Sequence, residues 1–387
     1  MHRQQRAKIP RALIIGGGIA GLTTALALQQ AGLTVRVFEQ ADASREEGAG
    51  IALWSNAAHV LTHLGCDDLL QSLGAPITQI VRYTPTGRIL SAQPLGHLTS
   101  RMGIGSFAVH RAEFHRGLLQ AVAPDTVSFQ ARCIRFRQDG GGVAVEFADG
   151  REAQGDLLIG ADGIRSVIRT QMFGQRTLRY AGYTTIRGIA SFEHPFLCPG
   201  KLFETWGRGS QFGAVRLTQG RVYWFLRLSG PARGAKREKA ELQALCHTWH
   251  EPIEAIIAAT EETALVQRDV YDCKPLSRWG QGAITPVGDA AHPMTTSLAQ
   301  GACQAIEDAG VLGSCLQADP VLPALCNYEQ ARIGRATNMV KLARRLAKLE
   351  QWDYPLVSWV RNLLVLRPPH AIQERFTQQI FGFRVSQ

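Results

Sequence analysis

Residues 12–21 read ALIIGGGIAG, and residues 33–39 read LTVRVFE. The first stretch is a short apolar run typical of a buried parallel strand, followed at once by glycines in the spacing GxGxxG. Small and apolar residues then continue at helical spacing as far as Gly32, and the second stretch is again typical of a strand. Two strands joined by a helix predict a βαβ unit and therefore an α/β fold.

Each glycine of this turn has a physical task. Gly16 permits the tight turn after the strand, Gly18 lets the backbone approach a pyrophosphate, and Gly21 lets the helix pack closely on the strand. The unpaired N–H groups at the start of the helix attract phosphate. Glu39 ends the second strand, where a carboxylate can accept hydrogen bonds from a ribose diol. The pattern predicts a bound dinucleotide and by itself leaves NAD and FAD open.

The composition is that of a folded protein with more than one domain. Of 387 residues, 45% are hydrophobic and 19% are charged, which excludes global disorder and fibrous folds. The eight cysteines are too widely spaced for a CxxC redox pair or a zinc knuckle, and no metal site is expected. The basic N-terminus is not followed by the apolar stretch of a signal peptide, so we expect a cytoplasmic protein without a transmembrane segment. The net charge of +10 suits anionic small molecules, and no nucleic-acid-binding module is recognisable.

The rest of the chain alternates between mixed and β-rich blocks. Residues 108–122 are typical of a helix, residues 180–229 read as four successive strands, and residues 77–93 add a hairpin. From residue 320 onward the pattern is helical, and its basic part, 327–352, is typical of a packed helix with a solvated face. The expected division is a nucleotide-binding domain (1–76, 101–179 and 273–330), a substrate domain with an antiparallel sheet (77–100 and 180–272) and a helical C-terminal region (331–387).

Two further motifs place acidic residues after predicted strands. GADGIRSVIR (160–169) contains Asp162, which can bond a ribose or simply form a turn. VGDAAHPM (287–294) contains Asp289, which can accept from a ribityl hydroxyl or act as an ordinary helix cap. A helix predicted to begin near Gly301 would direct its dipole toward negative charge on a reduced flavin.

Together these motifs resemble the FAD-dependent monooxygenases of the aromatic hydroxylase type, which include p-hydroxybenzoate, salicylate and urate hydroxylases. The resemblance spans about residues 11–345 and rests on GGGIAGL with Glu39, GAGIAL (48–53), VHRAEF with Arg111, GADGIRSVIR, and GDAAHPM followed by QGACQAIEDA. It implies a Rossmann-like FAD-binding domain with an inserted antiparallel β-sheet substrate domain and a helical C-terminus. ETWGRGSQFG and RVYWF also resemble the substrate sheet of urate hydroxylases and zeaxanthin epoxidases.

The resemblance also implies which residues hold FAD. The turn residues Gly16, Gly18, Ile19, Ala20 and Gly21 would hold the pyrophosphate, and Glu39 the adenosine ribose. The other residues assigned to the cofactor by resemblance are Gly50, Arg111 near the pyrophosphate and ribityl chain, Cys133 through its backbone at the adenine, Asp162 toward FAD or NAD(P)H, Asp289 on the ribityl chain, and Gly301 and Ala302 at the flavin pyrimidine edge.

The activity implied by the resemblance is a hydroxylation. NAD(P)H reduces FAD, O₂ adds at the flavin C4a position, and the resulting hydroperoxide transfers a hydroxyl to an aromatic or other electron-rich molecule. Tyr223 is the candidate catalytic residue because a polar group that deprotonates a phenol-like ring makes the ring more nucleophilic; a tyrosine packed in the core is the other interpretation. The residues expected to line the substrate pocket are Tyr223, Phe225, Thr296, Ser297 and Ala299.

The loop before QGACQ departs from the family pattern. The family usually has a proline where this chain has Thr296 and a glycine where it has Ala299, and both changes add atoms to the wall of the pocket. Urate hydroxylases carry an acid where this chain has Ser297, which argues against urate as the substrate.

Several alternatives remain open at the level of sequence. The same scaffold can serve as an epoxidase of an alkene or polyene, or as a non-catalytic binding protein with the FAD fold. A flavin halogenase lacks support because no W-x-W-x-I-P motif is present, and an NAD-dependent dehydrogenase leaves the second and third motifs unexplained. The expected partners are an aromatic or lipophilic small molecule, O₂ and NADH or NADPH, with the chain a monomer or homodimer.

Overall fold

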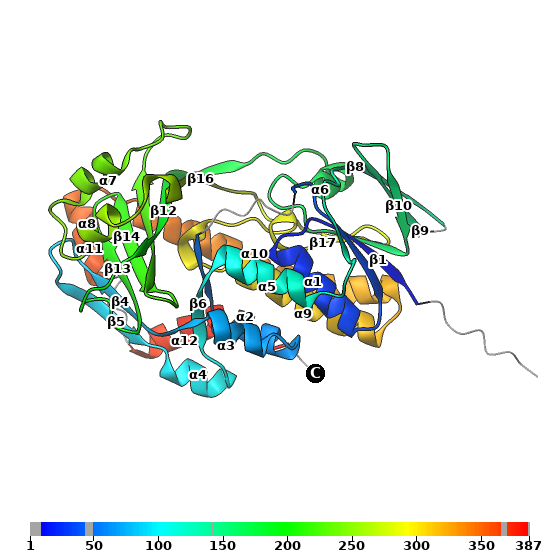
Figure 1. Ribbon diagram of the computed structural model, residues 1–387, viewed down its shortest axis with the longest axis horizontal. Helices are drawn as coiled ribbons and strands as arrows, with labels where there is room; N and C mark the ends of the chain where they lie inside the picture. Colours follow the sequence, from blue (N-terminus) through cyan, green and yellow to red (C-terminus); the bar gives the residue numbers. More distant parts are fainter. Residues whose placement is uncertain (1–8, 43–48, 141, 365–369, 386–387) are drawn as a thin grey trace, which may run out of the picture.

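A parallel five-stranded sheet forms one end of the molecule (Figure 1). The structure, a computed structural model, describes residues 9–42, 49–140, 142–364 and 370–385. The strands, in spatial order, are β17 (Ile284–Pro286), β11 (Leu157–Gly160), β1 (Arg11–Ile15), β2 (Thr34–Phe38) and β7 (Val127–Ser128). The predicted βαβ unit is confirmed, since β1 leads into helix α1 (Ile19–Gln30) and pairs in parallel with β2.

Strand β1 contributes to two separate cores because successive side chains in a strand point to opposite faces. Ala12 and Ile14 pack in the core that also contains residues of α1 and α9 (Gly301–Ala318). Leu13 and Ile15 pack in a cluster with residues of a small antiparallel sheet. That sheet consists of β8 (Cys133–Asp139), β9 (Gly142–Phe147) and β10 (Glu152–Gly155). The parallel sheet is thus covered on both faces, as parallel sheets usually are.

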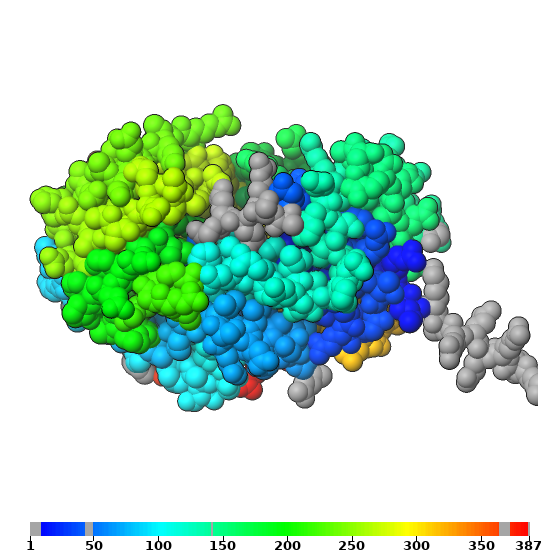
Figure 2. Space-filling model, in the orientation of Figure 1, coloured from blue at the N-terminus to red at the C-terminus, as the bar shows by residue number. Residues whose placement is uncertain are grey.

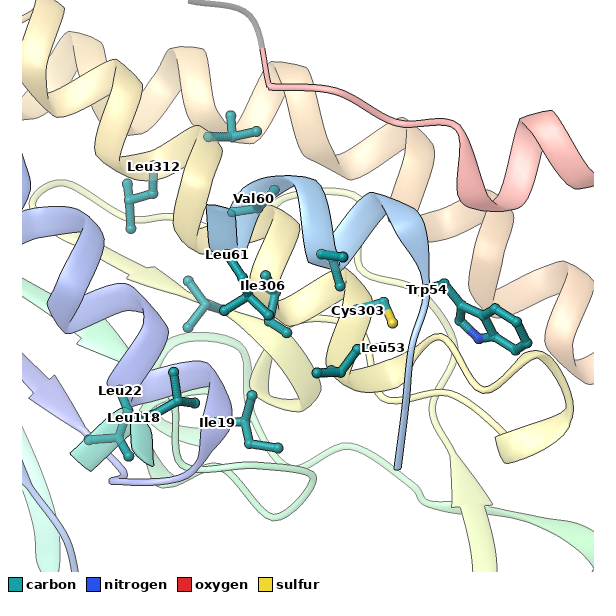
Figure 3. Close-up of a cluster of buried hydrophobic side chains, with 14 of the residues drawn as sticks. Ile19, Leu22, Leu53, Trp54, Val60, Leu61, Leu118, Cys303, Ile306 and Leu312 are labelled. Atoms are coloured by element: carbon teal, nitrogen blue, oxygen red, sulfur yellow. The ribbon is translucent and has the colours of Figure 1, made fainter. Parts of the chain in front are cut away.

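The larger core joins helices from several parts of the sequence. Its labelled members in Figure 3 are Ile19 and Leu22 of α1, Leu53 and Trp54, Val60 and Leu61 of α2 (Ser55–His63), Leu118, and Cys303, Ile306 and Leu312 of α9. The ring of Trp54 stacks on that of Phe381, with 4.4 Å between the centroids. This contact brings α12 (His370–Phe381), the last helix, against the start of α2.

A nine-stranded sheet forms the other end of the molecule, coloured mainly green in Figure 2. Its strands, in spatial order, are β16 (Val266–Asp272), β12 (Arg179–Ser191), β15 (Arg221–Ser229), β14 (Ser210–Arg216), β13 (Gly200–Trp206), β4 (Ala75–Tyr83), β6 (Ser106–His110) and β3 (Gly50–Leu53), with β5 (Ile89–Pro94) paired to β4. The pairs from β16 to β13 are antiparallel, as predicted, but β13 and β4 are parallel.

The two faces of this sheet have different roles. Along β15, Val222, Trp224 and Leu226 pack in a core with residues of α7 (Lys239–Cys246) and α8 (Ile253–Ala258). Tyr223 and Phe225 alternate with them and therefore lie on the opposite face, which lines a cleft.

The strand boundaries correct two expectations. The predicted helix at 108–122 begins only at Arg111, as α5 (Arg111–Ala121), because residues 106–110 pair with β3 and β4. The strands β3 and β6 extend the nine-stranded sheet, although the sequence division assigned them to the nucleotide-binding part. The remaining helices and turns are α3 (Asp67–Leu73), α4 (Gly96–Met102), α6 (Val167–Phe173), η1 (Glu262–Ala264), η2 (Gly288–Ala290) and η3 (Thr296–Leu298).

The end of the described chain is helical, as predicted, through α10 (Val321–Glu350), α11 (Pro355–Leu364) and α12. The boundary expected after residue 330 falls inside α10, which is continuous. Lys341, Arg345 and Lys348 of α10 are exposed, whereas Arg332 is fully buried, so the basic helix has one solvated face. No helix among the described residues is long and apolar enough to cross a membrane. All eight cysteines are free thiols.

Candidate active site

A single cleft of about 550 Å³ lies where the nine-stranded sheet meets the carboxyl ends of the parallel strands. Its walls come from the glycine turn after β1, from the segments around Asp289 and Gly301, from the inner face of the nine-stranded sheet, and from α12. The carboxyl ends of parallel strands are where α/β folds usually bind ligands. Thirteen of the predicted site residues line this cleft: Gly18, Ile19, Ala20, Gly50, Arg111, Tyr223, Phe225, Asp289, Thr296, Ser297, Ala299, Gly301 and Ala302.

The glycine turn has the geometry that its sequence predicts. Gly16 has a φ of +108°, and a Cβ there would lie 2.3 Å from the carbonyl oxygen of Ala161. A Cβ on Gly21 would lie 1.8 Å from the Gly16 oxygen, so only glycine allows α1 to pack this closely on the turn. Gly18 has no atom within 4 Å of such a position and faces open space. Gly16 and Gly21 therefore shape the turn, and Gly18 leaves room for a ligand.

Glu39 is held beside the glycine turn but does not line the cleft. Its Oε2 accepts a hydrogen bond of 2.6 Å from the N–H of Gly17, and its Oε1 accepts one of 2.8 Å from the N–H of Ala41. A carboxylate can accept about four hydrogen bonds, so two positions remain for hydroxyl groups of a ligand.

Asp162 has one oxygen occupied and one free. Its Oδ2 accepts from the N–H groups of Val167 and Ile168 at the start of α6, while its Oδ1 is buried without a partner among the described residues. Burial raises the pKa of this carboxyl. Cys133, in β8, lies near Asp162, and burial raises the pKa of its thiol to about 12. Asp162 thus caps α6 and still offers one acceptor, while Cys133 is an inert buried thiol.

Arg169 joins the second and third motifs, a link that the sequence analysis did not predict. Its Nη1 donates to the carbonyl oxygens of Asp289 (3.1 Å) and Ala290 (2.8 Å), and its Nη2 donates to that of Ile164. Asp289 therefore has its backbone fixed while its side chain is exposed to the cleft. Although this carboxylate opens onto the cleft, the protein around it removes part of its solvation and raises its pKa, against the opposing positive charges of His292, Arg169 and Arg111.

A buried charged network supports the same turn from behind. The Oδ2 of Asp308 accepts from the N–H of Gly288 (2.8 Å) and pairs with Nε2 of His292 (2.6 Å), and its Oδ1 accepts from Nε of Arg332 (2.7 Å). Burial alone would raise the pKa of Asp308, but the charges and hydrogen bonds of His292 and Arg332 lower it. His292 is thus committed to Asp308 and orders the turn.

The loop between Asp289 and α9 ends in an uncommon backbone conformation. Ala299 has a φ of +49°, in the left-handed region that favours glycine. Its carbonyl oxygen accepts from the indole N–H of Trp54 at 3.1 Å. Helix α9 begins two residues later at Gly301, and the side chain of its N-cap residue, Gln300, forms no capping hydrogen bond with the described residues. The helix therefore presents unpaired donors and a positive dipole end to the cleft.

The inner face of the nine-stranded sheet carries the two predicted aromatic residues. The Tyr223 ring lies against Gly50, where a Cβ would come within 2.0 Å of the ring Cγ. The Phe225 ring lies over Gly213, where a Cβ would come within 2.3 Å of the ring Cζ. Tyr223 is thus held by close packing on a glycine, and its hydroxyl has no partner among the described residues.

Three residues that sequence reasoning missed hold the loop at 296–298. Tyr183 places its hydroxyl 3.0 Å from Oγ1 of Thr296, and Arg227 donates from Nη2 to the Thr296 carbonyl oxygen at 2.9 Å. Glu350, the last residue of α10, accepts from the hydroxyl of Ser297 at 2.7 Å. No local pattern identifies these residues, because they come from three distant elements.

The residues present fit a flavin dinucleotide. The open space at Gly18, the free Oδ1 of Asp162, the exposed carboxylate of Asp289 and the uncapped start of α9 are the features such a ligand needs. Five predicted residues do not line the cleft: Gly16, Gly21, Glu39, Cys133 and Asp162. Of the GAGIAL motif, Gly48 lies outside the described residues.

Known proteins of similar sequence are flavoenzymes. The chain is 38% identical to the aurachin C monooxygenase/isomerase of Stigmatella aurantiaca, with 91% of this chain and 93% of that protein covered. It is 35% identical to an FAD-dependent urate hydroxylase of Klebsiella pneumoniae, with 87% and 89% covered. The solved structure of Klebsiella pneumoniae HpxO complexed with FAD and uric acid matches with a TM-score of 0.89 at 30% identity, covering 96% of each chain.

The fold and the cleft, together with these relatives, define an FAD-dependent monooxygenase. The chain belongs to the FAD binding domain family, whose model matches residues 10–342. The relatives named above are a monooxygenase and a hydroxylase, which favours that class over the halogenase, the dehydrogenase and the non-catalytic binding protein considered from the sequence.

Proposed function

We propose that this protein uses NADH or NADPH and O₂ to hydroxylate an aromatic or similarly electron-rich small molecule. The observation that carries the proposal is the continuity of the cleft, which joins the glycine turn at Gly18 to the aromatic face of the sheet at Tyr223 and Phe225. A dinucleotide bound at one end of this space would present its flavin to a ring bound at the other end.

Residues from all three motifs would hold the cofactor. The turn at Gly16–Gly21 and the guanidinium of Arg111 would bind the pyrophosphate, and Glu39 the adenosine ribose. Asp162 and the backbone near Cys133 would meet the adenosine half, Asp289 the ribityl hydroxyls, and the N–H groups at Gly301 and Ala302 the flavin pyrimidine edge. When bound, FAD supplies the redox chemistry by accepting electrons from NAD(P)H and activating O₂.

The protein's own contribution at the reacting end is to position the ring and exclude water. Tyr223 offers a hydroxyl without a partner among the described residues, which can accept a hydrogen bond from a ring hydroxyl and so make the ring more nucleophilic. Thr296 and Ser297 form the facing wall. Because the Ser297 hydroxyl is bound to Glu350 and carries no charge, this wall supports a substrate other than urate.

The test is to purify the protein, determine its FAD content from its absorbance spectrum, and measure NADH and NADPH oxidation with a panel of aromatic compounds. We expect a yellow protein that consumes NAD(P)H and O₂ in step with hydroxylated product for at least one aromatic. A colourless protein that does not take up added FAD would refute the proposal, as would NAD(P)H oxidation that yields only hydrogen peroxide with every aromatic tested.

A further inference from the structure

One arginine on the cleft face of the nine-stranded sheet, Arg187, forms no ion pair with any residue that the structure describes. Arg187, in β12, lies directly opposite Phe225 of β15, so the two side chains share the face that lines the cleft. Among the described residues, the Arg187 guanidinium has neither an ion pair nor a hydrogen bond. A charged side chain in a cleft, held in place by a paired strand and left unpartnered, is a candidate ligand-binding group.

The other arginines near it are already occupied. Arg82 pairs with Glu204 across the sheet at 3.0 Å, and Arg227 pairs with Glu350 at 2.8 Å. Arg111 also lacks an ion pair among the described residues, but it lies at the start of α5, beside the glycine turn, where the dinucleotide is proposed to bind. Within the described part of the chain, Arg187 is therefore the cleft-lining arginine at the substrate end that has no acidic partner.

The acids that line the cleft do not neutralise this charge. They are Glu204, which Arg82 holds, and Asp289, which follows β17 near the start of α9. Thr185 precedes Arg187 by two residues on β12, so both side chains point to the same face of the sheet. The Thr185 hydroxyl is buried and has no partner among the described residues. Thr185 lies opposite Arg227, whose Nε also lacks a partner. These two unpartnered polar groups lie on the same face of the sheet as Arg187 and add no negative charge beside it.

We propose that Arg187 binds an anionic oxygen group carried by the aromatic substrate, either a ring carboxylate or an ionised ring hydroxyl. This inference rests on the proposed function and specifies its substrate class. The ring would lie against Phe225, next to Tyr223, which occupies the position diagonal to Arg187 across the β12–β15 pair. Arg187 would orient the ring, because a guanidinium binds a carboxylate through two parallel hydrogen bonds.

The test uses the FAD-loaded protein and three simple ligands: benzoate, its neutral counterpart benzamide, and 4-cyanophenol below and above the pH at which it ionises. Binding is followed by the change in flavin absorbance. We expect benzoate or ionised 4-cyanophenol to bind the native protein at least about tenfold more tightly than its neutral counterpart, as a charged hydrogen-bonded pair provides. Preference for one anion over the other identifies the carboxylate or the hydroxyl as the group that is bound.

The variant Arg187→Gln should abolish that preference while leaving benzamide affinity within about twofold, and Arg187→Lys should retain part of it. Arg208→Gln removes one positive charge from the exposed turn after β13 and serves as the matched control, with no change expected. Equal binding of charged and neutral ligands by the native protein would overturn the inference. So would an Arg187→Gln variant that raises only the KM for NAD(P)H, since Arg187 would then bind a cofactor phosphate.

The two proposals fail in different ways. Loss of FAD binding or of aromatic-stimulated NAD(P)H oxidation in the native protein counts against the monooxygenase function. Normal hydroxylation by the native protein, combined with an Arg187→Gln variant that still discriminates benzoate from benzamide, counts against the anion subsite alone.

Discussion

Glu350 and Arg227 form a buried ion pair, with 2.8 Å between Oε1 and Nη1 and less than a tenth of either side chain exposed. The same two residues bind the pocket loop, Glu350 through the Ser297 hydroxyl and Arg227 through the Thr296 carbonyl oxygen. A helix end, a strand and the loop that faces the substrate are therefore coupled through one pair of charges.

Breaking this pair should destabilise the protein strongly. Glu350→Gln leaves the Arg227 charge buried without its partner, which typically costs about 3–5 kcal/mol. The free energy of unfolding in urea, followed by circular dichroism, measures the loss. The exposed pair Arg137–Glu152 is the control, because Glu152→Gln should cost no more than about 1 kcal/mol. Equal, small losses for both variants would show that the buried pair contributes nothing.

Asp308 should contribute a stability that disappears in acid. Its folded pKa is lowered, so the unfolded state binds its proton more readily, and its contribution is complete above the unfolded pKa and lost as pH falls through the folded pKa. The difference in unfolding free energy between the native protein and Asp308→Asn should therefore be largest near pH 7 and shrink as pH falls below about 4. A difference that stays constant with pH contradicts the assignment.

Ala299→Gly should stabilise the protein. A left-handed conformation costs a non-glycine residue about 1–2 kcal/mol, which exceeds the ~0.5–1 kcal/mol that glycine loses through its greater freedom in the unfolded chain. The expected net gain in unfolding free energy is up to about 1 kcal/mol. Ala244→Gly, at an exposed position within α7, should instead lose about 1 kcal/mol. The two variants should shift the denaturation midpoint in opposite directions.

Glu39→Ala should weaken FAD binding without unfolding the protein. The variant removes the carboxylate proposed to bind the ribose and also frees the N–H groups of Gly17 and Ala41. Loss of hydrogen bonds to a charged group predicts a rise in the FAD dissociation constant of about tenfold or more. Quenching of FAD fluorescence on titration with apoprotein measures it. Unchanged FAD affinity would exclude Glu39 from the site.

Tyr223→Phe should retain bound FAD and reduce hydroxylation. The ring still packs on Gly50, so only the hydroxyl is lost, and removal of an acid–base group typically lowers kcat by about 10²–10⁴-fold. The dependence of kcat on pH should also change. Gly50→Ala should produce a similar loss by another route, because the added Cβ would displace the tyrosine ring. Full activity in Tyr223→Phe would show that the hydroxyl is not needed for catalysis and that the residue serves only in packing.

The parts of the molecule that follow from local constraints could be predicted from the sequence. The turn at Gly16–Gly21 requires glycine for steric reasons that are complete within a few residues and one neighbouring strand. The predicted βαβ unit and the predicted α/β fold are confirmed by the parallel pairing of β1 with β2 and by the family match. Asp289 follows a strand, and that position is a local signal that the sequence shows directly.

The long-range contacts could not be predicted. Arg227 and Glu350 lie 123 residues apart, and nothing in the sequence around either one distinguishes it from an ordinary surface charge. Arg187 has no motif around it, and only the folded cleft shows that it forms no ion pair or hydrogen bond with the described residues. The start of α5 was misplaced because residues 106–110 are drawn into a strand by β3 and β4, which a helical pattern cannot reveal.

The order in which the parallel sheet receives its strands has a consequence for biosynthesis. Its inner strands β1 and β11 are separated by about 140 residues, and its edge strand β17 comes more than a hundred residues after β11. Nearly three hundred residues must therefore be synthesised before the last strand of this sheet is available. The contact between α1 and α9 forms later still, because α9 follows β17. Until then the apolar flanks of the glycine turn cannot be fully buried, so we expect this sheet to form late in folding, because it depends on contacts between distant parts of the chain.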